Sequence, residues 1–270
     1  VRFDMIFQTL APEIEIVTPI RDQKLTRQEE ISYLKSNGID LDWEKAKYSI
    51  NKGLWGTSVG GDETLTSHLA LPESAYPSQL ESKLPQTVAL TFIKGELTAI
   101  DGQENASEIL IQNLNDLGSK YAIGRDIHVG DTIVGIKGRV GFEAAAALIT
   151  VKAHHLLEKH TLTKWQLQHK DYLSNFYGMH LHEGQYLDPV MRDMEAFLTS
   201  SQASVSGIVE VVLKPYHFTI NGVKSPYDLM NAKFGSYGEV NSGWTAEEAK
   251  GFIKINGNQN RIHQHVNSDA

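Results

Sequence analysis

The stretch Tyr48-Ser49-Ile50-Asn51-Lys52-Gly53-Leu54-Trp55-Gly56-Thr57-Ser58, followed closely by Gly60-Gly61, is the part around which the chain is organised. Its glycines allow positive φ angles and a close approach of the backbone to a ligand. The hydroxyls of Ser49 and Ser58 can donate hydrogen bonds to a carboxylate and accept them from an amine. Because this composition suits neither a helix nor a long strand, we predict a loop. It is either a surface turn with a buried tryptophan or part of a ligand site.

The composition is that of a globular protein with a large core. Of the 270 residues, 41% are hydrophobic, and the formal net charge of −8 argues against a nucleic-acid-binding surface. No apolar run approaches the length of a membrane span, and no cysteine is present, which excludes disulfides and thiol chemistry. We therefore expect a cytoplasmic protein with neither nucleic acid nor membrane as a partner.

The first 40 residues predict the last unit of an α/β domain. Apolar spacing indicates a helix over 1–11, alternation indicates a strand at Ile14–Val17, and a capping box at Thr26 indicates a helix that ends at Gly38. Helix, strand and helix at this spacing are typical of a parallel sheet. Since the chain opens inside a helical pattern and without methionine, we expect it to be a piece of a longer protein.

After residue 40 the patterns favour hairpins and separate helices, so the predicted fold class is α+β with a mixed or antiparallel sheet. An irregular segment with three prolines should precede the first hairpin. Hairpins are predicted at 87–100, around Lys94-Gly95, and at 208–221. The other predicted elements are helices over 105–120 (with Ile109, Leu110, Leu114 and Leu117 inward), 144–157 and 165–177, helices from Asp188, Ser225 and Thr245, and a strand at Phe252–Ile255.

No motif in the chain is sufficient for catalysis. Neither a Gly-x-Ser-x-Gly elbow nor a phosphate-binding glycine loop is present. The histidine clusters lack carboxylate or cysteine partners at a zinc-site spacing, so we predict no metal site and no catalytic residue. These clusters are His154-His155, His180-Leu181-His182 and His263-Gln264-His265. The chain offers instead a binding surface, to which we expect Arg2 to belong.

Segments in the right order over nearly the whole chain resemble the argininosuccinate synthase family. Each segment alone is weak, but their order is specific. They are Val1-Arg2-Phe3-Asp4 with Leu10-Ala11-Pro12-Glu13-Ile14, Tyr48-Ser49 to Trp55-Gly56-Thr57-Ser58, Gly124-Arg125-Asp126 with Gly135-Ile136-Lys137-Gly138-Arg139, Ser225-Pro226-Tyr227-Asp228-Leu229, and Ala249-Lys250-Gly251-Phe252-Ile253.

The resemblance implies a reaction that joins citrulline to aspartate in arginine biosynthesis. In this family the ureido oxygen of citrulline attacks the α-phosphate of ATP, pyrophosphate leaves, and the aspartate amine displaces AMP, with Mg²⁺ assisting. Arg2, Ser49 and Ser58 match residues that bind citrulline. The ATP, Mg²⁺ and aspartate sites match no residue after Val1, so they are expected upstream, and the 270-residue chain alone is expected to be inactive.

The resemblance also implies a domain plan and a homotetramer. Residues 1–40 would be the remnant of a nucleotide-binding α/β domain, 41–240 a synthetase domain for citrulline binding and oligomerisation, and 241–270 a C-terminal arm. Apolar faces near Leu156-Leu157 and Met191–Leu198, and the tail after Ile255, suit subunit contacts. Ordinary packing within the chain is the alternative.

Two positions depart from the family pattern. The family's glutamate that meets the α-amino group of citrulline falls at Gly130, beside Asp131, and its tyrosine falls at Phe142. Either Asp131 takes the place of the glutamate and citrulline is the substrate, or an N-acyl citrulline, which carries no charge there, is used. A non-catalytic assembly domain with no ligand remains as a third hypothesis.

Overall fold

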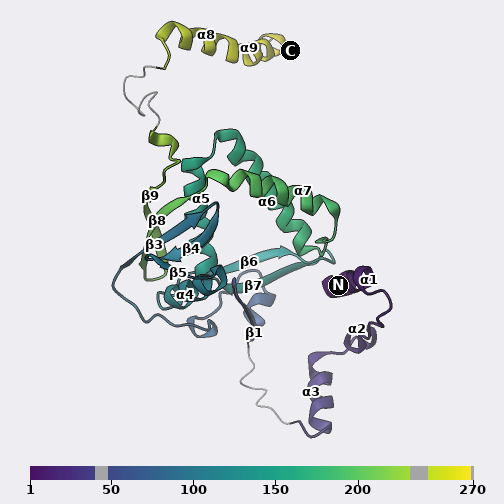
Figure 1. Cartoon of the computed structure of the whole chain (residues 1–270). Coiled ribbons are helices and arrows are strands. Elements are labelled where there is room, and N and C mark those ends of the chain that lie inside the picture. Colours follow the sequence, from purple (N-terminus) through teal and green to yellow (C-terminus); the bar gives the residue numbers. More distant parts are fainter. Residues whose placement is uncertain (40–47, 232–242, 269–270) are drawn as a thin grey trace. The chain divides into compact units, whose positions relative to one another are not determined.

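The computed structural model describes residues 1–39, 48–231 and 243–268. By its internal contacts the chain divides into two compact units, Val1–Tyr227 and Asp228–Ala270. The larger unit contains two antiparallel sheets and most of the helices, and this arrangement confirms the α+β fold class (Figure 1).

The first sheet has five strands in the order β5-β4-β3-β8-β9. The β3–β4 hairpin turns at Lys94 and Gly95, which have φ angles of 50° and 85°. Both predicted hairpins are thereby confirmed, and β3 and β8 pair to join them into one sheet. The strands are β3 (Gln86–Ile93), β4 (Glu96–Ile100), β5 (Gln103–Glu104), β8 (Gly207–Lys214) and β9 (His217–Lys224).

The main core lies between this sheet and helices α4 (Ser107–Ser119) and α5 (Ala145–Thr161). Alternate side chains of β3 and β8 point into it, as expected for strands with one buried face. Leu110 and Leu114 are buried as predicted, but Ile109 is 37% exposed and Ile111 takes its place. Leu114 lies three residues after Ile111 and four after Leu110, so all three side chains share the face of the helix that packs against the core.

The second sheet has four strands in the order β1-β2-β7-β6, and it corrects the prediction of a loop over 48–58. That stretch is a hairpin with its turn at Leu54-Trp55. Gly56 has a φ of 143°, and a Cβ there would lie 2.7 Å from the Cβ of Ala144, so glycine lets the turn pack closely. The strands are β1 (Ser49–Gly53), β2 (Gly56–Gly60), β6 (Arg125–Asp131) and β7 (Lys137–Glu143).

The N-terminal segment is helical, and the predicted strand at Ile14–Val17 is wrong. It comprises α1 (Arg2–Leu10), α2 (Pro19–Gln23) and α3 (Arg27–Ser36). Helix α3 begins with the predicted capping box at Thr26. Within residues 1–39 no strand is present with which Ile14–Val17 could pair, and an alternating apolar run forms a strand only where its backbone groups find such a partner.

Helices α6 (Lys164–His182) and α7 (Pro189–Ser201) complete the larger unit. Asp188 caps α7 through a hydrogen bond from the Val190 backbone N–H, as predicted. Helix α6 does not end at Gly178 but continues to His182, and Gly184, with a φ of 81°, follows it. The segment between β2 and β3 is irregular, as predicted, with 3₁₀ turns at η1 (Asp62–Leu65) and η2 (Glu73–Ala75), and a further turn, η3 (Gln202–Ser204), follows α7.

The smaller unit contains the 3₁₀ turn η4 (Leu229–Asn231) and helices α8 (Ala246–Asn256) and α9 (Asn258–Asn267). The capping box at Thr245 is confirmed. The predicted strand at Phe252–Ile255 is wrong because these residues continue the helix that this capping box begins.

Candidate functional site

The register of the four-stranded sheet places three of the predicted site residues on one face. Ser58 in β2 lies opposite Phe142 in β7 and opposite Asn51 in β1. Ser49 is two residues before Asn51, and alternate residues of a strand point to the same face. Ser49, Ser58 and Phe142 therefore share a face, and Ser58 and Phe142 are direct neighbours across the strands.

Gly130 belongs to this face, whereas Asp131 does not. The β6–β7 register pairs Asp126 with Phe142 and continues in steps of two to Gly130. The Asp131 side chain is on the opposite face, where its carboxylate lies 2.6 Å from the Lys137 ammonium. The replacement of a glutamate at Gly130 by the neighbouring Asp131 therefore finds no support in the register.

Arg2 is connected to the end of β6 through a histidine. Its Nη1 donates a hydrogen bond to the His182 carbonyl oxygen at 2.9 Å. The Nε2 of His182 lies 3.1 Å from the carbonyl oxygen of Asp131. The structure thus brings Arg2 near the backbone of Asp131, and it shows no direct contact of Arg2 with Ser49, Ser58 or Phe142 among the described residues.

Two arginines in the motifs that carry the resemblance hold a loop on the opposite face of the sheet. Arg139 donates hydrogen bonds of 2.8 Å to three carbonyl oxygens, those of Glu63, Thr66 and Leu69. The buried guanidinium of Arg125 lies 3.3 Å from the Glu143 carboxylate. It also donates to the carbonyl oxygen of Ser78 and pairs with Glu73. These arginines therefore fix the loop that packs on the face opposite the predicted site residues, a role that the sequence alone did not indicate.

A buried polar cluster connects α5, α6 and η3. The Glu158 carboxylate is 0% exposed, and it accepts hydrogen bonds from Lys170 Nζ at 2.7 Å and Gln202 Nε2 at 2.9 Å. His154 Nε2 lies 2.9 Å from Gln202 Oε1. Because that amide oxygen can only accept, His154 Nε2 carries a proton.

Burial sets the protonation of this cluster in two different ways. Burial lowers the pKa of His154 because it disfavours the charged ring, and this effect exceeds the opposing attraction of the Glu158 carboxylate. Burial also opposes the charged form of Glu158. The positive charge of a protonated His154, the hydrogen bonds from Lys170 and Gln202, and the charge of Lys170 outweigh this effect and hold the pKa of Glu158 below its ordinary value. At neutral pH the cluster therefore holds a carboxylate, an ammonium and a neutral imidazole.

One group of side chains in the described part of the chain has metal-ligand spacing. The ligand atoms of His155, Glu158 and Asp171 lie within 4.8 Å of one another. The Lys170 ammonium lies 2.7 Å from Glu158 and 3.6 Å from Asp171, so a positive charge already occupies this place. The group of His155, Glu158 and Asp171 consequently does not fit a divalent cation. Of the three histidine clusters considered in the sequence, only the first contributes a residue, His155, to this group.

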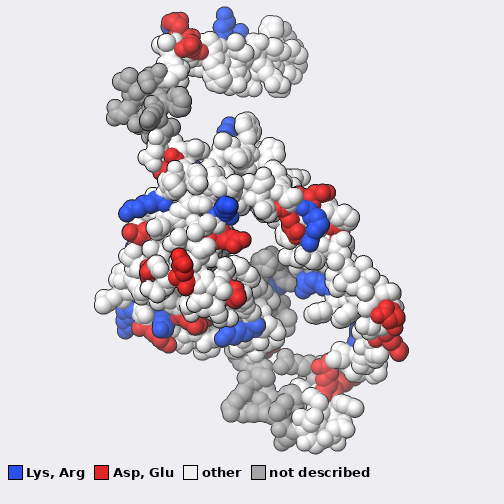
Figure 2. Space-filling view, viewed as in Figure 1, with Lys and Arg blue, Asp and Glu red and all other residues white. Residues whose placement is uncertain are grey.

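The visible surface carries charges of both signs. On the face shown in Figure 2, lysine and arginine side chains alternate with aspartate and glutamate. Among the residues that the structure describes, no helix combines the length and the apolar character of a membrane span.

Comparison with known proteins identifies two family matches. The family model for the "Arginosuccinate synthase C-terminal domain" matches residues 48–263, and that for the "Arginosuccinate synthase N-terminal HUP domain" matches residues 1–40.

Curated relatives share the same printed name, argininosuccinate synthase. The relative from Dictyoglomus turgidum is 36% identical over 265 residues, which are 97% of this chain and 66% of the relative. That from Methanocaldococcus jannaschii is 33% identical over 97% of this chain and 67% of its own length. That from Xanthomonas campestris is 35% identical over 99% of this chain and 68% of its own length. The chain thus spans about two thirds of the length of the curated relatives it matches.

Proposed function

Because the chain belongs to the argininosuccinate synthase family, we propose that its protein condenses citrulline with aspartate to argininosuccinate, converting ATP to AMP and pyrophosphate. The observation that carries the proposal is the match of both family domains, in order, over residues 1–40 and 48–263. The reaction places the protein among ligases that form carbon–nitrogen bonds, in arginine biosynthesis and in the cytoplasm.

We assign citrulline to the face of the four-stranded sheet that carries Ser49, Ser58 and Phe142. The hydroxyls can hold a carboxylate or an amine there, and Arg2 can add a positive charge. These residues bind and orient the substrate, which accelerates the reaction through positioning. Asp131 remains part of the proposed site through its backbone, since its carbonyl oxygen lies 3.1 Å from the His182 ring that contacts Arg2.

ATP and Mg²⁺ belong, in this proposal, to the part of the relatives that this chain does not match. The N-terminal family model covers only residues 1–40 here, and no glycine loop in the sequence suits a phosphate. The described residues do not form a fitting magnesium site, so we assign them no role in binding the metal. Their task is to place citrulline beside the nucleotide.

We expect the 270-residue chain to release no pyrophosphate when it is given ATP, Mg²⁺, citrulline and aspartate, whereas the full-length protein should release it and form argininosuccinate. Binding one substrate without holding the reacting phosphate does not lower the barrier. A coupled pyrophosphate assay with mass spectrometry of the product checks both proteins. Turnover by the 270-residue chain at the full-length rate would contradict the first expectation, and no argininosuccinate from the full-length protein would contradict the function.

We further propose a homotetramer. Within the predicted apolar faces, Leu157 and Met191 are 0% exposed and pack inside the chain, whereas Phe197 is 37% exposed and can contact another subunit. Exposed apolar side chains also gather on α8 and α9, including Phe252 at 68% and Ile255 at 77% exposure. Light scattering of the full-length preparation used in the pyrophosphate assay gives the number of subunits.

A second candidate substrate is an N-acyl citrulline, favoured by Gly130 and Phe142. Both positions lie on the proposed citrulline face and carry no polar side-chain atom, while the Asp131 carboxylate is on the other face. A free ammonium buried there without a partner would be costly, but an amide is uncharged and larger. The His128 ring lies edge-on to Phe142 at 6.0 Å and gives this end of the face an aromatic wall.

Introducing Gly130→Glu with Phe142→Tyr into the full-length protein should raise kcat/KM for citrulline relative to N-acetyl citrulline by about tenfold or more, since a hydrogen bond to a charged group contributes about 1.5–3 kcal/mol. A Cβ at Gly130 would lie 2.7 Å from His128 Nε2, the end of a side chain that can turn away. Gly222→Glu, in open space on β9, is the matched control and should leave the ratio unchanged. If the unmodified enzyme uses citrulline and ignores the N-acetyl form, this candidate is wrong.

A further inference from the structure

Helix α6 exposes a row of large apolar side chains. The helix has 19 residues and none of them is buried, whereas eight of the 17 residues of α5 are buried. Trp165 is 62% exposed, Tyr172 71%, Phe176 43% and Met179 57%. Single exposed apolar residues are ordinary, but a contiguous row of this size marks an interaction site. These four residues, together with the exposed His169, form the α6 stripe.

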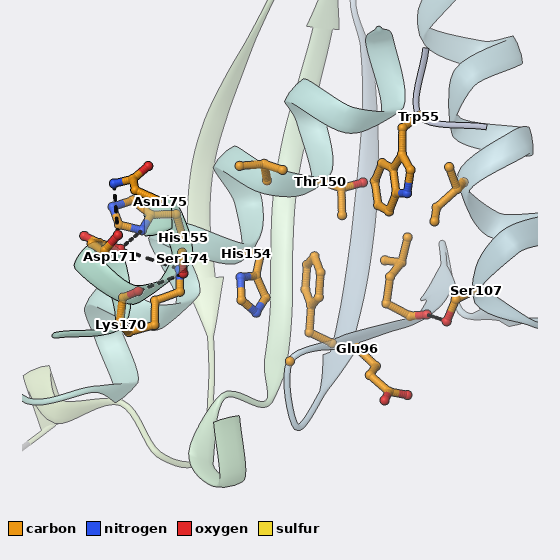
Figure 3. Close-up of a pocket in the computed structure, with 15 residues that line it drawn as sticks. Trp55, Glu96, Ser107, Thr150, His154, His155, Lys170, Asp171, Ser174 and Asn175 are labelled. Atoms are coloured by element: carbon orange, nitrogen blue, oxygen red, sulfur yellow. Dashed lines mark hydrogen bonds and ion pairs between the residues drawn. The ribbon is translucent and has the colours of Figure 1, made fainter. Parts of the chain in front are cut away.

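The α6 stripe lies on the side of the helix that faces away from α5. Lys170, Asp171 and Ser174 line a cavity of about 630 Å³ that α6 shares with α5, and in Figure 3 they gather around His155. Tyr172 is two residues from both Lys170 and Ser174, which puts its side chain about 160–200° away from theirs around the helix. Packing against α5 therefore leaves the α6 stripe uncovered.

The spacing of the α6 stripe indicates that its partner is a helix. Its five positions follow one another at intervals of four, three, four and three residues. This is the heptad spacing of a helix that packs lengthwise on another helix, with the side chains of each filling gaps in the other. The α6 stripe extends for about 21 Å at a rise of 1.5 Å per residue, which is long enough for such a contact.

The charge pattern of α6 permits the partner to be identical. Within residues 165–182 the only lysine, arginine, aspartate or glutamate residues are Lys170 and Asp171, and both lie on the cavity side. Two copies of the α6 stripe can therefore face each other without bringing like charges together. A helix that lies on a membrane would instead carry lysines and arginines beside its apolar face.

The two ends of α6 favour an antiparallel pair. The helix begins with Lys164, whose ammonium lies 4.7 Å from the centroid of the Trp165 ring, and Glu183 follows its last residue. In an antiparallel pair the lysine of one helix lies beside the glutamate and the negative dipole end of the other. A parallel pair would bring the two lysines together. Trp165 and Met179 are each seven residues from Tyr172, so a two-fold axis at Tyr172 pairs them across the contact.

We propose that α6 docks on the α6 of a second copy of this chain, antiparallel, about a two-fold axis at Tyr172. The Tyr172 rings meet at the centre, and Trp165 packs on Met179 of the partner subunit, a favourable contact between an aromatic ring and a sulfur. Because the four apolar side chains are about half exposed, the pair covers about 1,000 Å² in both copies together. This is the lower limit of specific interfaces, which suits one of several contacts in an oligomer. The contact needs no ligand and does not depend on the proposed reaction.

Charge substitutions in the full-length protein test the contact by sedimentation velocity. Tyr172→Glu places two carboxylates face to face at the axis, so it should weaken this association step about tenfold or more, and Tyr172→Lys should do the same. An equimolar mixture of the two variants should associate again, because opposite charges then meet. Tyr33→Glu, at a tyrosine of α3 that is 70% exposed, is the matched control and should assemble like the unmodified protein.

Cysteine cross-linking tests the direction of the pair. The 270 residues contain no cysteine, and the unmodified full-length protein gives the background. With a short bis-maleimide, Tyr172→Cys should form a covalent dimer by itself. Trp165→Cys and Met179→Cys should do so only when both are present in the same chain, since each meets the other across the axis. Efficient cross-linking of Trp165→Cys alone would mean a parallel pair and would overturn the proposal.

Three further results would also overturn it. The first is a monomeric unmodified protein, and the second is a mixture of Tyr172→Glu and Tyr172→Lys that does not associate again. The third is a Tyr172→Glu variant that assembles like Tyr33→Glu. If that variant also has a lowered melting temperature, the α6 stripe packs within the longer chain instead of against a second copy.

Discussion

Replacing Glu158 by alanine is expected to lower the free energy of unfolding by about 3–5 kcal/mol, the range seen when one partner of a buried ion pair is removed. The carboxylate is 0% exposed and receives hydrogen bonds from Lys170 and Gln202. Its loss leaves the Lys170 ammonium, whose side chain is 16% exposed, without its main partner. Urea denaturation of the variant and the unmodified protein measures the difference.

Glu158→Gln and Glu104→Ala are the controls for this prediction. Glutamine keeps the volume and one acceptor but not the charge, so its effect should be intermediate. Glu104 is exposed on the short strand β5, and its replacement should change stability by less than about 0.5 kcal/mol. Equal stability of Glu158→Ala and Glu104→Ala would show that the buried cluster does not contribute as described.

The pH dependence of this effect has a definite sign. The folded-state pKa of Glu158 is lowered from 4.5, so its contribution is present above about that pH and is lost as pH falls through the folded pKa. The pKa of His154 is lowered from 6.5, so acid already reduces stability below that pH through this ring. The gap between the unmodified protein and Glu158→Gln should therefore persist at neutral pH and shrink in acid.

Gly124→Ala is expected to destabilise the protein by about 3 kcal/mol through backbone strain together with overpacking. Gly124 has a φ of 89°, and a Cβ there would lie 2.5 Å from the carbonyl carbon of Ala144 and 2.5 Å from the nitrogen of Ala145. Those are backbone atoms at the start of α5, so no side chain can turn away to make room. Thermal and urea unfolding of the variant provide the measurement.

Gly102→Ala separates the two causes. Gly102 also has a positive φ, 76°, but a Cβ there would meet nothing within 4 Å. Its replacement should therefore show only the conformational strain, about 1–2 kcal/mol. If Gly102→Ala destabilised the protein as much as Gly124→Ala, the close approach to α5 would not be the source of the larger effect.

Elements with local signals were predictable from the sequence. Capping boxes at Thr26 and Thr245 and the Asp188-Pro189 pair each mark a helix start that the structure confirms. In each case the side chain that caps the helix and the backbone N–H that it accepts from are two or three residues apart. Such signals depend little on the rest of the fold.

Short apolar runs were not predictable in the same way. Ile14–Val17 and Phe252–Ile255 were both predicted as strands, although one is not a strand and the other belongs to α8. A run of four residues fits helix and strand alike, and only its partners decide. The β1–β2 hairpin was missed for a different reason: its glycine-rich sequence favoured a loop, and β2 also pairs with β7, whose residues follow about eighty positions later.

For the candidate site, resemblance identified individual positions, and the register then showed which of them share a face. Ser58 and Phe142 are neighbours across β2 and β7, a relation that no local pattern contains. The cluster of Glu158, Lys170 and Gln202 could not be predicted either, since its members come from α5, α6 and η3. Groups that meet only after the chain has folded leave no spacing in the sequence.

The way in which Arg139 holds its loop affects how freely that loop can evolve. Its hydrogen bonds to Glu63, Thr66 and Leu69 all end on main-chain carbonyl oxygens, which every amino acid possesses. As far as these three bonds are concerned, the side chains at 63, 66 and 69 can diverge while the path of the backbone is kept. The arginine has no such freedom, because a lysine ends in a single nitrogen and lacks the rigid planar fork that reaches all three carbonyls.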